Sequence, residues 1–244
     1  MLLTLRNVRK SFRATKVIRD LDLSVAKGEF VGVIGPNGAG KTTAFGLISG
    51  ALQCDSGSVV FDGMDITRSG ADHRCRMGIG RTFQVPQPFQ NLSVFENVLV
   101  GATFGAALRG RPAATTAAHS LALCGLESLA DRQANKLTLL QRKRLELARA
   151  ISTHPQLLLL DEVGGGLTDS EMHELLELIV TLHRSGITIL WIEHIVHALV
   201  SVARRLVVLA DGAVLADGPP SEIIANNLVR QTYLGDELSM SGGV

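Results

Sequence analysis

Short runs of apolar, often β-branched residues alternate along the chain with segments of helical periodicity. The runs at residues 31–34, 157–160 and 187–192 are apolar almost throughout, as strands covered by helices on both faces are. Between the runs, apolar positions recur every three to four residues over 44–52 and 172–179. This alternation predicts an α/β core built on a mostly parallel sheet.

Local signals refine this outline at both ends of the chain. Thr168 and Glu171 form a capping-box pattern before the second helical segment, and Gly186 follows its end. Residues 3–6 alternate between apolar and polar, and an Asp-Gly pair at 211–212 separates two apolar runs. Antiparallel strands are therefore expected beside the parallel core.

The strand pattern fades in the middle of the chain, where residues 85–152 are rich in alanine and leucine with helical spacing. We expect an inserted α-helical subdomain there, with the remainder of the chain, residues 1–84 and 153–244, as the core. The stretch LRGRPAATT, residues 108–116, has the composition of an exposed connector.

Bulk composition excludes several classes of protein. The chain has 244 residues, 46% of them hydrophobic, which suffices for a large buried core. The net charge is +1 with scattered basic residues, so nucleic acid is not an expected partner. Three cysteines without CxxC spacing argue against a disulfide framework or zinc site and favour a reducing cytoplasm.

The sequence also shows no segment that is expected to enter a membrane. The longest uncharged, mostly apolar stretch, residues 98–108, is too short to span a bilayer, and the charged start lacks the apolar run of a secretory signal. Any membrane association is expected to come through a partner.

The strongest local motif is GPNGAGKT, residues 35–42, which directly follows the 31–34 run and precedes a helical segment. Glycines let successive backbone N–H groups point at phosphate oxygens, and the helix N-terminus adds positive potential. Lys41 is expected to reach the terminal phosphates and the Thr42 hydroxyl to bind Mg²⁺. The predicted nucleotide-binding residues of this loop are Gly35, Pro36, Asn37, Gly38, Ala39, Gly40, Lys41, Thr42 and Thr43.

Acidic and imidazole side chains follow two other predicted strands. Asp161 and Glu162 end the 157–160 run, at the edge of the sheet where ligands of open α/β folds bind. We expect Asp161 to hold the magnesium shell and Glu162 to polarise a water for in-line attack on the γ-phosphate. His194 follows the 187–192 run, where an imidazole can contact the same phosphate.

An amide in GRTFQVPQ is a further candidate for the metal and the attacking water. Gln84 follows a short strand-like run, and Pro86 prevents the strand from continuing. Gln84 is therefore expected on a loop that enters the helical region. By composition alone, Gln87 or Gln90 serves equally well, and a plain surface amide remains the alternative.

These motifs occur in the order and approximate spacing of the ATP-binding subunits of ABC transporters, which the chain resembles over essentially its whole length. Within that family it resembles the branched-chain amino-acid type, in particular the member whose glutamine loop is Arg-Thr-Phe-Gln. The stretches that carry this finer similarity are GIGRTFQ (78–84), NLSVFENVLVG (91–101), RLELARA (144–150), ADGPPSEI (216–223) and Tyr233-Leu234-Gly235.

The resemblance implies a RecA-like P-loop NTPase core with a helical subdomain, ATP and Mg²⁺ as ligands, and ATP hydrolysis that drives transport. It implies that Phe12 stacks on adenine, although an ordinary partly buried phenylalanine is the alternative. Two subunits pair head to tail, helices near Gln84 dock two transmembrane permeases, and a substrate-binding protein acts through these. The chain is then a peripheral protein at the cytoplasmic face of the inner or plasma membrane.

The family's signature, Leu-Ser-Gly-Gly-Gln, binds the ATP held by the other subunit, and here it is degenerate. The corresponding residues are Leu137, Thr138, Leu139, Leu140 and Gln141, so two leucines replace both glycines. We expect Leu140 to obstruct the close approach of backbone to phosphate. The three bases Arg142, Lys143 and Arg144 are expected to form a solvated face, while Leu145, Ala148 and Ile151 share an apolar one.

Two hypotheses follow from the substitution. In the first, this chain hydrolyses ATP with a second ATP-binding subunit that has an intact signature, so that a heterodimer is favoured over a homodimer. In the second, it is a regulatory or structural subunit that closes on ATP but barely hydrolyses it. Two other classes of protein are disfavoured. Non-transport ABC proteins usually carry two cassettes per chain, and a small-molecule kinase requires lid arginines that we do not find.

Overall fold

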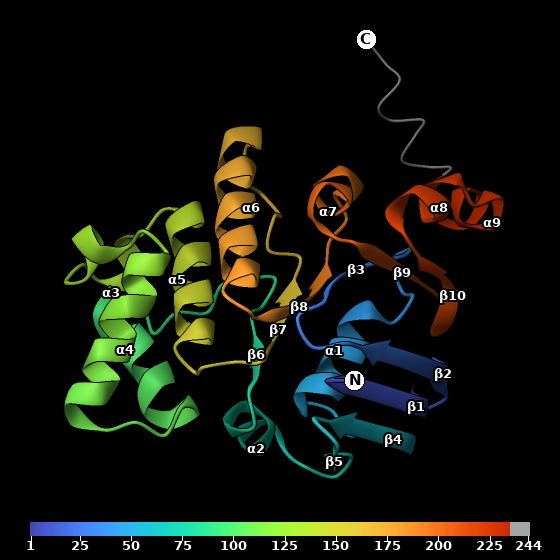
Figure 1. Ribbon diagram of the computed structural model, residues 1–244, viewed down its shortest axis with the longest axis horizontal. Coiled ribbons are helices and arrows are strands. Elements are labelled where there is room, and N and C mark those ends of the chain that lie inside the picture. The colour runs from blue at the N-terminus through green and yellow to red at the C-terminus, as the bar shows by residue number, and fades with distance from the viewer. Residues whose placement is uncertain (235–244) are drawn as a thin grey trace. The chain divides into compact units, whose positions relative to one another are not determined.

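The computed structural model describes residues 1–234 (Figure 1). Contacts divide the chain into two compact units, one formed by residues 1–69 with the segment from Leu190 onward and the other by residues 70–189. Gly235, the last residue of the quoted Tyr-Leu-Gly motif, lies outside the described residues.

The first unit is dominated by strands of a mixed sheet. Their order is β5-β4-β1-β2-β10-β9-β3, in which β1 pairs antiparallel with β2 and β4, β9 antiparallel with β10, and β3 parallel with β9. The strands are β1 (Leu3–Phe12), β2 (Thr15–Val25), β3 (Phe30–Ile34), β4 (Ser56–Phe61), β5 (Met64–Asp65), β9 (Arg205–Ala210) and β10 (Ala213–Gly218). The helices are α1 (Lys41–Ser49), α7 (Val196–Val202), α8 (Pro220–Ala225) and α9 (Asn227–Val229), followed by a π-helical turn, Arg230–Leu234.

Two turns of this unit follow from backbone chemistry. The predicted Asp-Gly turn is confirmed, because Asp211 and Gly212 both have positive φ, 47° and 76°, as a tight hairpin between β9 and β10 requires. Helix α1 ends at Ser49, where Gly50 adopts φ 79°. The helical pattern over residues 44–52 therefore runs past the end of the helix, since Ala51 and Leu52 follow the capping glycine.

The second unit is mainly helical. Its elements are α2 (Ala71–Arg76), β6 (Ile79–Arg81), α3 (Val94–Val100), a π-helical turn (Gly101–Gly105), α4 (Gly110–Leu123), two 3₁₀ turns (Glu127–Leu129 and Ala134–Lys136), α5 (Leu139–Ile151), β7 (Leu157–Asp161) and α6 (Asp169–Arg184). Helices α3, α4 and α5 lie side by side (Figure 1), and β6 pairs in parallel with the fully buried β7. Strand β8 (Thr188–Ile192) spans the division between the units and is buried throughout.

The caps of the second unit explain where its helices begin. The capping box of Thr168 and Glu171 at α6 is confirmed. The prediction of an exposed connector over residues 108–116 is wrong from Gly110 onward, because helix α4 begins at that residue. Pro112 lies in the first turn of α4, where the missing N–H has no intrahelical partner to lose.

The α/β class and the antiparallel flanking strands are confirmed, and helices occupy the predicted middle of the chain. The contact division, however, falls at 69/70 and 189/190, so β6, β7 and α6 cluster with the helices. A separate helical subdomain bounded at residues 85 and 152 stays a prediction. No helix among residues 1–234 is long and apolar enough to cross a membrane.

Candidate nucleotide-binding and catalytic site

The glycine loop between β3 and α1 is too tightly packed for side chains at two of its glycines. Gly35 has φ 147°, and a Cβ there would lie 2.0 Å from the Leu209 carbonyl oxygen. Gly40 has φ 97°, and a Cβ there would meet Ile18 at 2.6 Å. Gly38 also has positive φ, 82°, but faces open space. The glycines therefore permit a tightly curled loop that leads into the N-terminus of α1.

Lys41 occupies the inside of this curl. Its ammonium donates to the carbonyl oxygens of Gly35 at 2.6 Å and Pro36 at 3.0 Å, and the residue is only 6% exposed. Thr42, the next residue of α1, is exposed. A buried cation inside a glycine cradle at a helix N-terminus is an arrangement suited to a phosphate chain.

The carboxyl end of β7 carries the predicted Asp161, which is 2% exposed. Its Oδ2 accepts a hydrogen bond from Arg81 Nη2, on the neighbouring strand β6, at 2.9 Å. Its backbone N–H donates to the hydroxyl of the buried Thr82. The aspartate is thus held by charge and through its backbone.

Glu162, the next residue, is half-buried and has φ 49°, a left-handed conformation that a side chain adopts at a cost of about 1–2 kcal/mol. Its carboxylate accepts a hydrogen bond from the side-chain amide of Gln84. Gln87 bonds to α5 through its backbone N–H and carbonyl, and the Gln90 carbonyl accepts from the Asn135 N–H. Of the three candidate glutamines, the geometry therefore favours Gln84.

Two further predicted residues belong to the first unit. His194 lies two residues after β8 and is half-buried, and its backbone N–H donates to the Glu193 carboxylate at 3.1 Å. Phe12 ends β1 and is 44% exposed, with the Lys10 ammonium 5.6 Å from its ring centroid. An exposed ring beside a cation is available for stacking.

The degenerate signature forms the start of α5. Thr138 is the N-cap, and its hydroxyl and the Gln141 side chain make a complete capping box. Leu140 is only 8% exposed, whereas Leu139 is 41% exposed. The expectation that the Leu140 side chain obstructs an approaching phosphate is therefore wrong, because that side chain is turned into the interior; Leu139 is the exposed one.

The expected solvated face of three bases is also wrong. Arg142 donates to the carbonyls of Leu137 and Asn135, and Lys143 is 4% exposed. Arg144 pairs with Glu174 of α6 at 2.6 Å. Arg142 thus holds the loop before α5, and Arg144 contacts the neighbouring helix α6. Apolar periodicity alone does not indicate either contact.

Sequence reasoning also missed a buried carboxylate on α5. Glu146 is 4% exposed, accepts the Gln87 backbone N–H at 2.9 Å and pairs with Arg149 at 2.9 Å. Burial raises its pKa, against the opposing charge of Arg149. Arg149 in turn donates to the Gln87 carbonyl and lies over the Phe89 ring. In the sequence, the only indication of this burial is that Glu146 lies next to the apolar face of the predicted helix.

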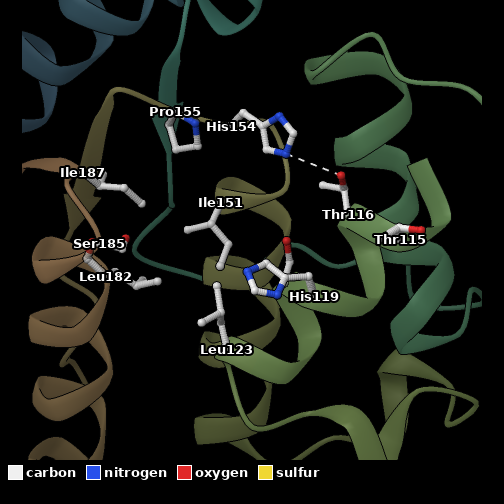
Figure 2. Close-up of a pocket in the computed structure, with 11 residues that line it drawn as sticks. Thr115, Thr116, His119, Leu123, Ile151, His154, Pro155, Leu182, Ser185 and Ile187 are labelled. Carbon is white, nitrogen blue, oxygen red and sulfur yellow. Dashed lines mark hydrogen bonds between the residues drawn. The ribbon is translucent and has the colours of Figure 1, made fainter. Parts of the chain in front are cut away.

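The second unit also contains a cavity of about 410 Å³ beside α4, shown in Figure 2. Leu123, Ile151 and Leu182 form its apolar part. His119 also lines it, and His154 is hydrogen-bonded to Thr116 at 3.4 Å. None of the predicted phosphate-handling residues lines this cavity, so it is distinct from the glycine loop and from the strand-end acids.

A glycine cradle around a lysine, between a buried strand and a helix, together with a buried strand that ends in Asp-Glu, defines a P-loop NTPase. The family model described as ABC transporter matches residues 18–164, and the chain belongs to this family.

Two relatives match nearly the whole chain. The lipopolysaccharide export system ATP-binding protein LptB of Acidithiobacillus ferridurans is 36% identical over 98% of this chain and 99% of its own length. A probable branched-chain amino acid transport ATP-binding protein, LivG of Archaeoglobus fulgidus, is 35% identical over 96% and 95%.

A solved ATP-binding cassette of an ABC transporter in its ADP conformation superposes with a TM-score of 0.88, at 31% identity over 96% of this chain and 98% of that one. A nucleotide-free ATP-binding cassette from an ABC transporter gives 0.88 at 30% identity, over 95% and 98%. The chain is therefore an ATPase subunit of the ABC type that binds ATP with Mg²⁺ and acts in a dimer with transmembrane permease partners.

Proposed function

We propose that the glycine loop and the strand-end acids of this chain act on one ATP, and that the Arg81–Gln84 segment prepares the two acids for that role. The observation that carries this proposal is the pairing of Asp161 with Arg81 and of Glu162 with Gln84. Two adjacent carboxylates, each already oriented by a neighbour, are suited to separate tasks of metal binding and proton transfer.

The donor atoms fit a magnesium ion. The exposed hydroxyl of Thr42, the amide oxygen of Gln84 and the carboxylate of Asp161 are all hard oxygen ligands, which Mg²⁺ prefers. When bound, the ion neutralises charge that develops on the phosphates during transfer.

The protein's own residues supply the remaining steps. Lys41 leaves the loop carbonyls for the β- and γ-phosphates, and backbone N–H groups of the loop, which Pro36 lacks, bind the phosphate oxygens. Glu162 accepts a proton from a water that Gln84 orients, and His194 contacts the γ-phosphate. Phe12 stacks on the adenine.

The transport role that we propose is import of branched-chain or related amino acids. It is supported by the Arg-Thr-Phe-Gln segment at residues 81–84 and by the 35% identity to the probable branched-chain transport protein. Export of lipopolysaccharide is a second candidate, favoured by the 36% identity to the lipopolysaccharide export protein.

For the assembly, we propose a peripheral location at the cytoplasmic face of the membrane, two permeases and a substrate-binding protein. A heterodimer with a second ATP-binding subunit is favoured, because the exposed Leu139 stands in place of a signature glycine. An intact signature from the partner then completes the site on this chain.

ATP turnover by the purified chain, alone and beside Glu162→Gln, tests the catalytic assignment. We expect Glu162→Gln to abolish turnover and to retain nucleotide binding. Binding without turnover in both proteins, even with an intact-signature partner, would instead favour the regulatory role. Uptake of labelled leucine by cells that carry or lack the gene tests the cargo; unchanged leucine uptake together with disturbed lipopolysaccharide export would replace the import proposal.

A further inference from the structure

Arg81 forms an ion pair with Asp161, the carboxylate that we propose as a magnesium ligand. Its Nη2 lies 2.9 Å from Asp161 Oδ2, and the two side chains are only 12% and 3% exposed. The pairing is built into the sheet, because β6 and β7 run parallel with Arg81 opposite Leu159, two residues before the aspartate. Arg81 therefore reaches Asp161 along the strand direction from an ordered position.

The charge of Asp161 explains why a cation is needed there. A carboxylate removed from water without a partner is strongly unfavourable, and a buried ion pair compensates for part of this cost. The guanidinium also lies 5.2 Å from the Phe83 ring centroid, within the range of a cation–π contact. The Arg81 guanidinium is thus held both by Asp161 and by the Phe83 ring.

The same short segment contacts the second carboxylate. Three residues after Arg81, the Gln84 amide donates to Glu162. Residues 81–84 consequently contact both members of the Asp-Glu pair.

We propose that Arg81 is a placeholder cation: it neutralises Asp161 in the absence of nucleotide and is displaced from this carboxylate when the magnesium–nucleotide complex binds. The inference rests on the proposed role of Asp161. A guanidinium and a divalent cation repel each other at one carboxylate, so Arg81 sets the magnesium concentration that the site requires. Its release also frees the 81–84 segment to move together with Gln84.

The test is thermal unfolding of the full chain at a fixed saturating concentration of ADP, titrated with MgCl₂. The variants are Arg81→Gln, which removes the charge, and Arg81→Lys, which keeps it. Arg76→Gln is the matched control, because Arg76 forms an exposed pair with Asp72 at 2.8 Å in the same unit. ADP with a chelator, in place of magnesium, reports nucleotide binding alone.

We expect the midpoint magnesium concentration to fall on the order of tenfold in Arg81→Gln, because the competing charge is gone. It should stay near the parent value in Arg81→Lys and Arg76→Gln. The stabilisation by ADP with chelator should be the same in all four proteins. A purely structural role for Arg81 would lower the unfolding temperature without moving the magnesium midpoint.

An unchanged or raised midpoint in Arg81→Gln would overturn the proposal. Asp161→Asn separates this failure from a failure of the catalytic assignment. If Asp161→Asn abolishes the magnesium response while Arg81→Gln leaves it unchanged, the magnesium site stands and the placeholder role is wrong. If Asp161→Asn leaves the response intact, the proposed role of Asp161 itself is wrong. Should Arg81→Gln fail to fold, Arg81→Met, which keeps the apolar stem, replaces it in the same titration.

Discussion

The side-chain amide of Gln84 donates a hydrogen bond to the carboxylate of Glu162, 78 residues further along the chain. Glu162 is held in a left-handed conformation directly after β7, and Gln84 follows β6, which pairs with β7 in parallel. The contact therefore joins the ends of two neighbouring strands. It orients the carboxylate that we propose as the base.

This contact predicts that Gln84→Ala lowers ATP turnover on the order of tenfold, because general-base catalysis contributes roughly 10²–10⁴-fold and depends on geometry. Nucleotide affinity should change less than turnover. Gln87→Ala is the control, since Gln87 contacts α5 through its backbone alone in the bonds described. Steady-state ATPase assays with both variants check this, and equal losses in the two would argue against a specific role for Gln84.

A second prediction concerns the glycine loop without nucleotide. Gly35→Ala should lower the free energy of unfolding by more than Gly38→Ala, although both residues have positive φ. A Cβ at Gly35 meets the Leu209 carbonyl at 2.0 Å, whereas one at Gly38 meets nothing within 4 Å. We expect about 1–2 kcal/mol for Gly38→Ala, the cost of the left-handed conformation.

Urea denaturation of the two glycine variants in nucleotide-free buffer gives the comparison. The steric clash at Gly35 should add to the conformational cost and exceed it. Equal destabilisation would mean that the loop relaxes away from Leu209.

The motifs that could be predicted are those whose residues are close in sequence. Residues 35–42 lie between a strand and a helix, so their spacing alone predicts the cradle, and Asp161 and Glu162 end one apolar run. Arg81 could not be paired with Asp161 in advance, because they lie 80 residues apart and their contact depends on the register of β6 with β7.

Helix α5 shows the complementary limit. Periodicity predicts the face of Leu145 and Ala148, and both are buried. It gives no reason to bury Lys143 or Glu146, because their burial depends on partners brought by other segments, such as the Gln87 backbone. Amphipathic patterns describe one helix, whereas buried charges depend on the tertiary fold.

A third prediction follows from the raised pKa of Glu146. Its ordinary pKa is 4.5 and burial raises it in the folded chain. Between the unfolded and folded values the folded state binds more protons, so the contribution of Glu146 to stability is fully present below about pH 4.5 and falls as pH rises to the folded pKa. The Glu146→Gln variant, neutral at every pH, does not share this loss.

The free energy of unfolding of the parent chain, minus that of Glu146→Gln, should therefore decrease as pH rises above about 4.5 and then level off. Urea denaturation of both proteins at intervals from about pH 4.5 to about pH 8 measures the difference, in which groups common to both cancel. A difference that increases with pH would mean that Arg149 holds the carboxylate charged and outweighs burial.

The two signature leucines give the last prediction, because the structure separates their roles. Leu140 is 8% exposed, so Leu140→Ala removes buried side chain and should cost about 2–4 kcal/mol of stability. Leu139 is 41% exposed and begins α5, beside Gly166, so Leu139→Ser should cost less than about 1 kcal/mol.

If an exposed leucine limits the approach of a partner's nucleotide, turnover should rise in Leu139→Ser and not in Leu140→Ala. Thermal unfolding and ATPase assays on the two variants, each at several protein concentrations because pairing is required, test both halves. A rise confined to Leu140→Ala would mean that α5 repacks when two subunits close, whereas no rise in either would show that the leucines are compatible with turnover and remove the reason to favour a heterodimer.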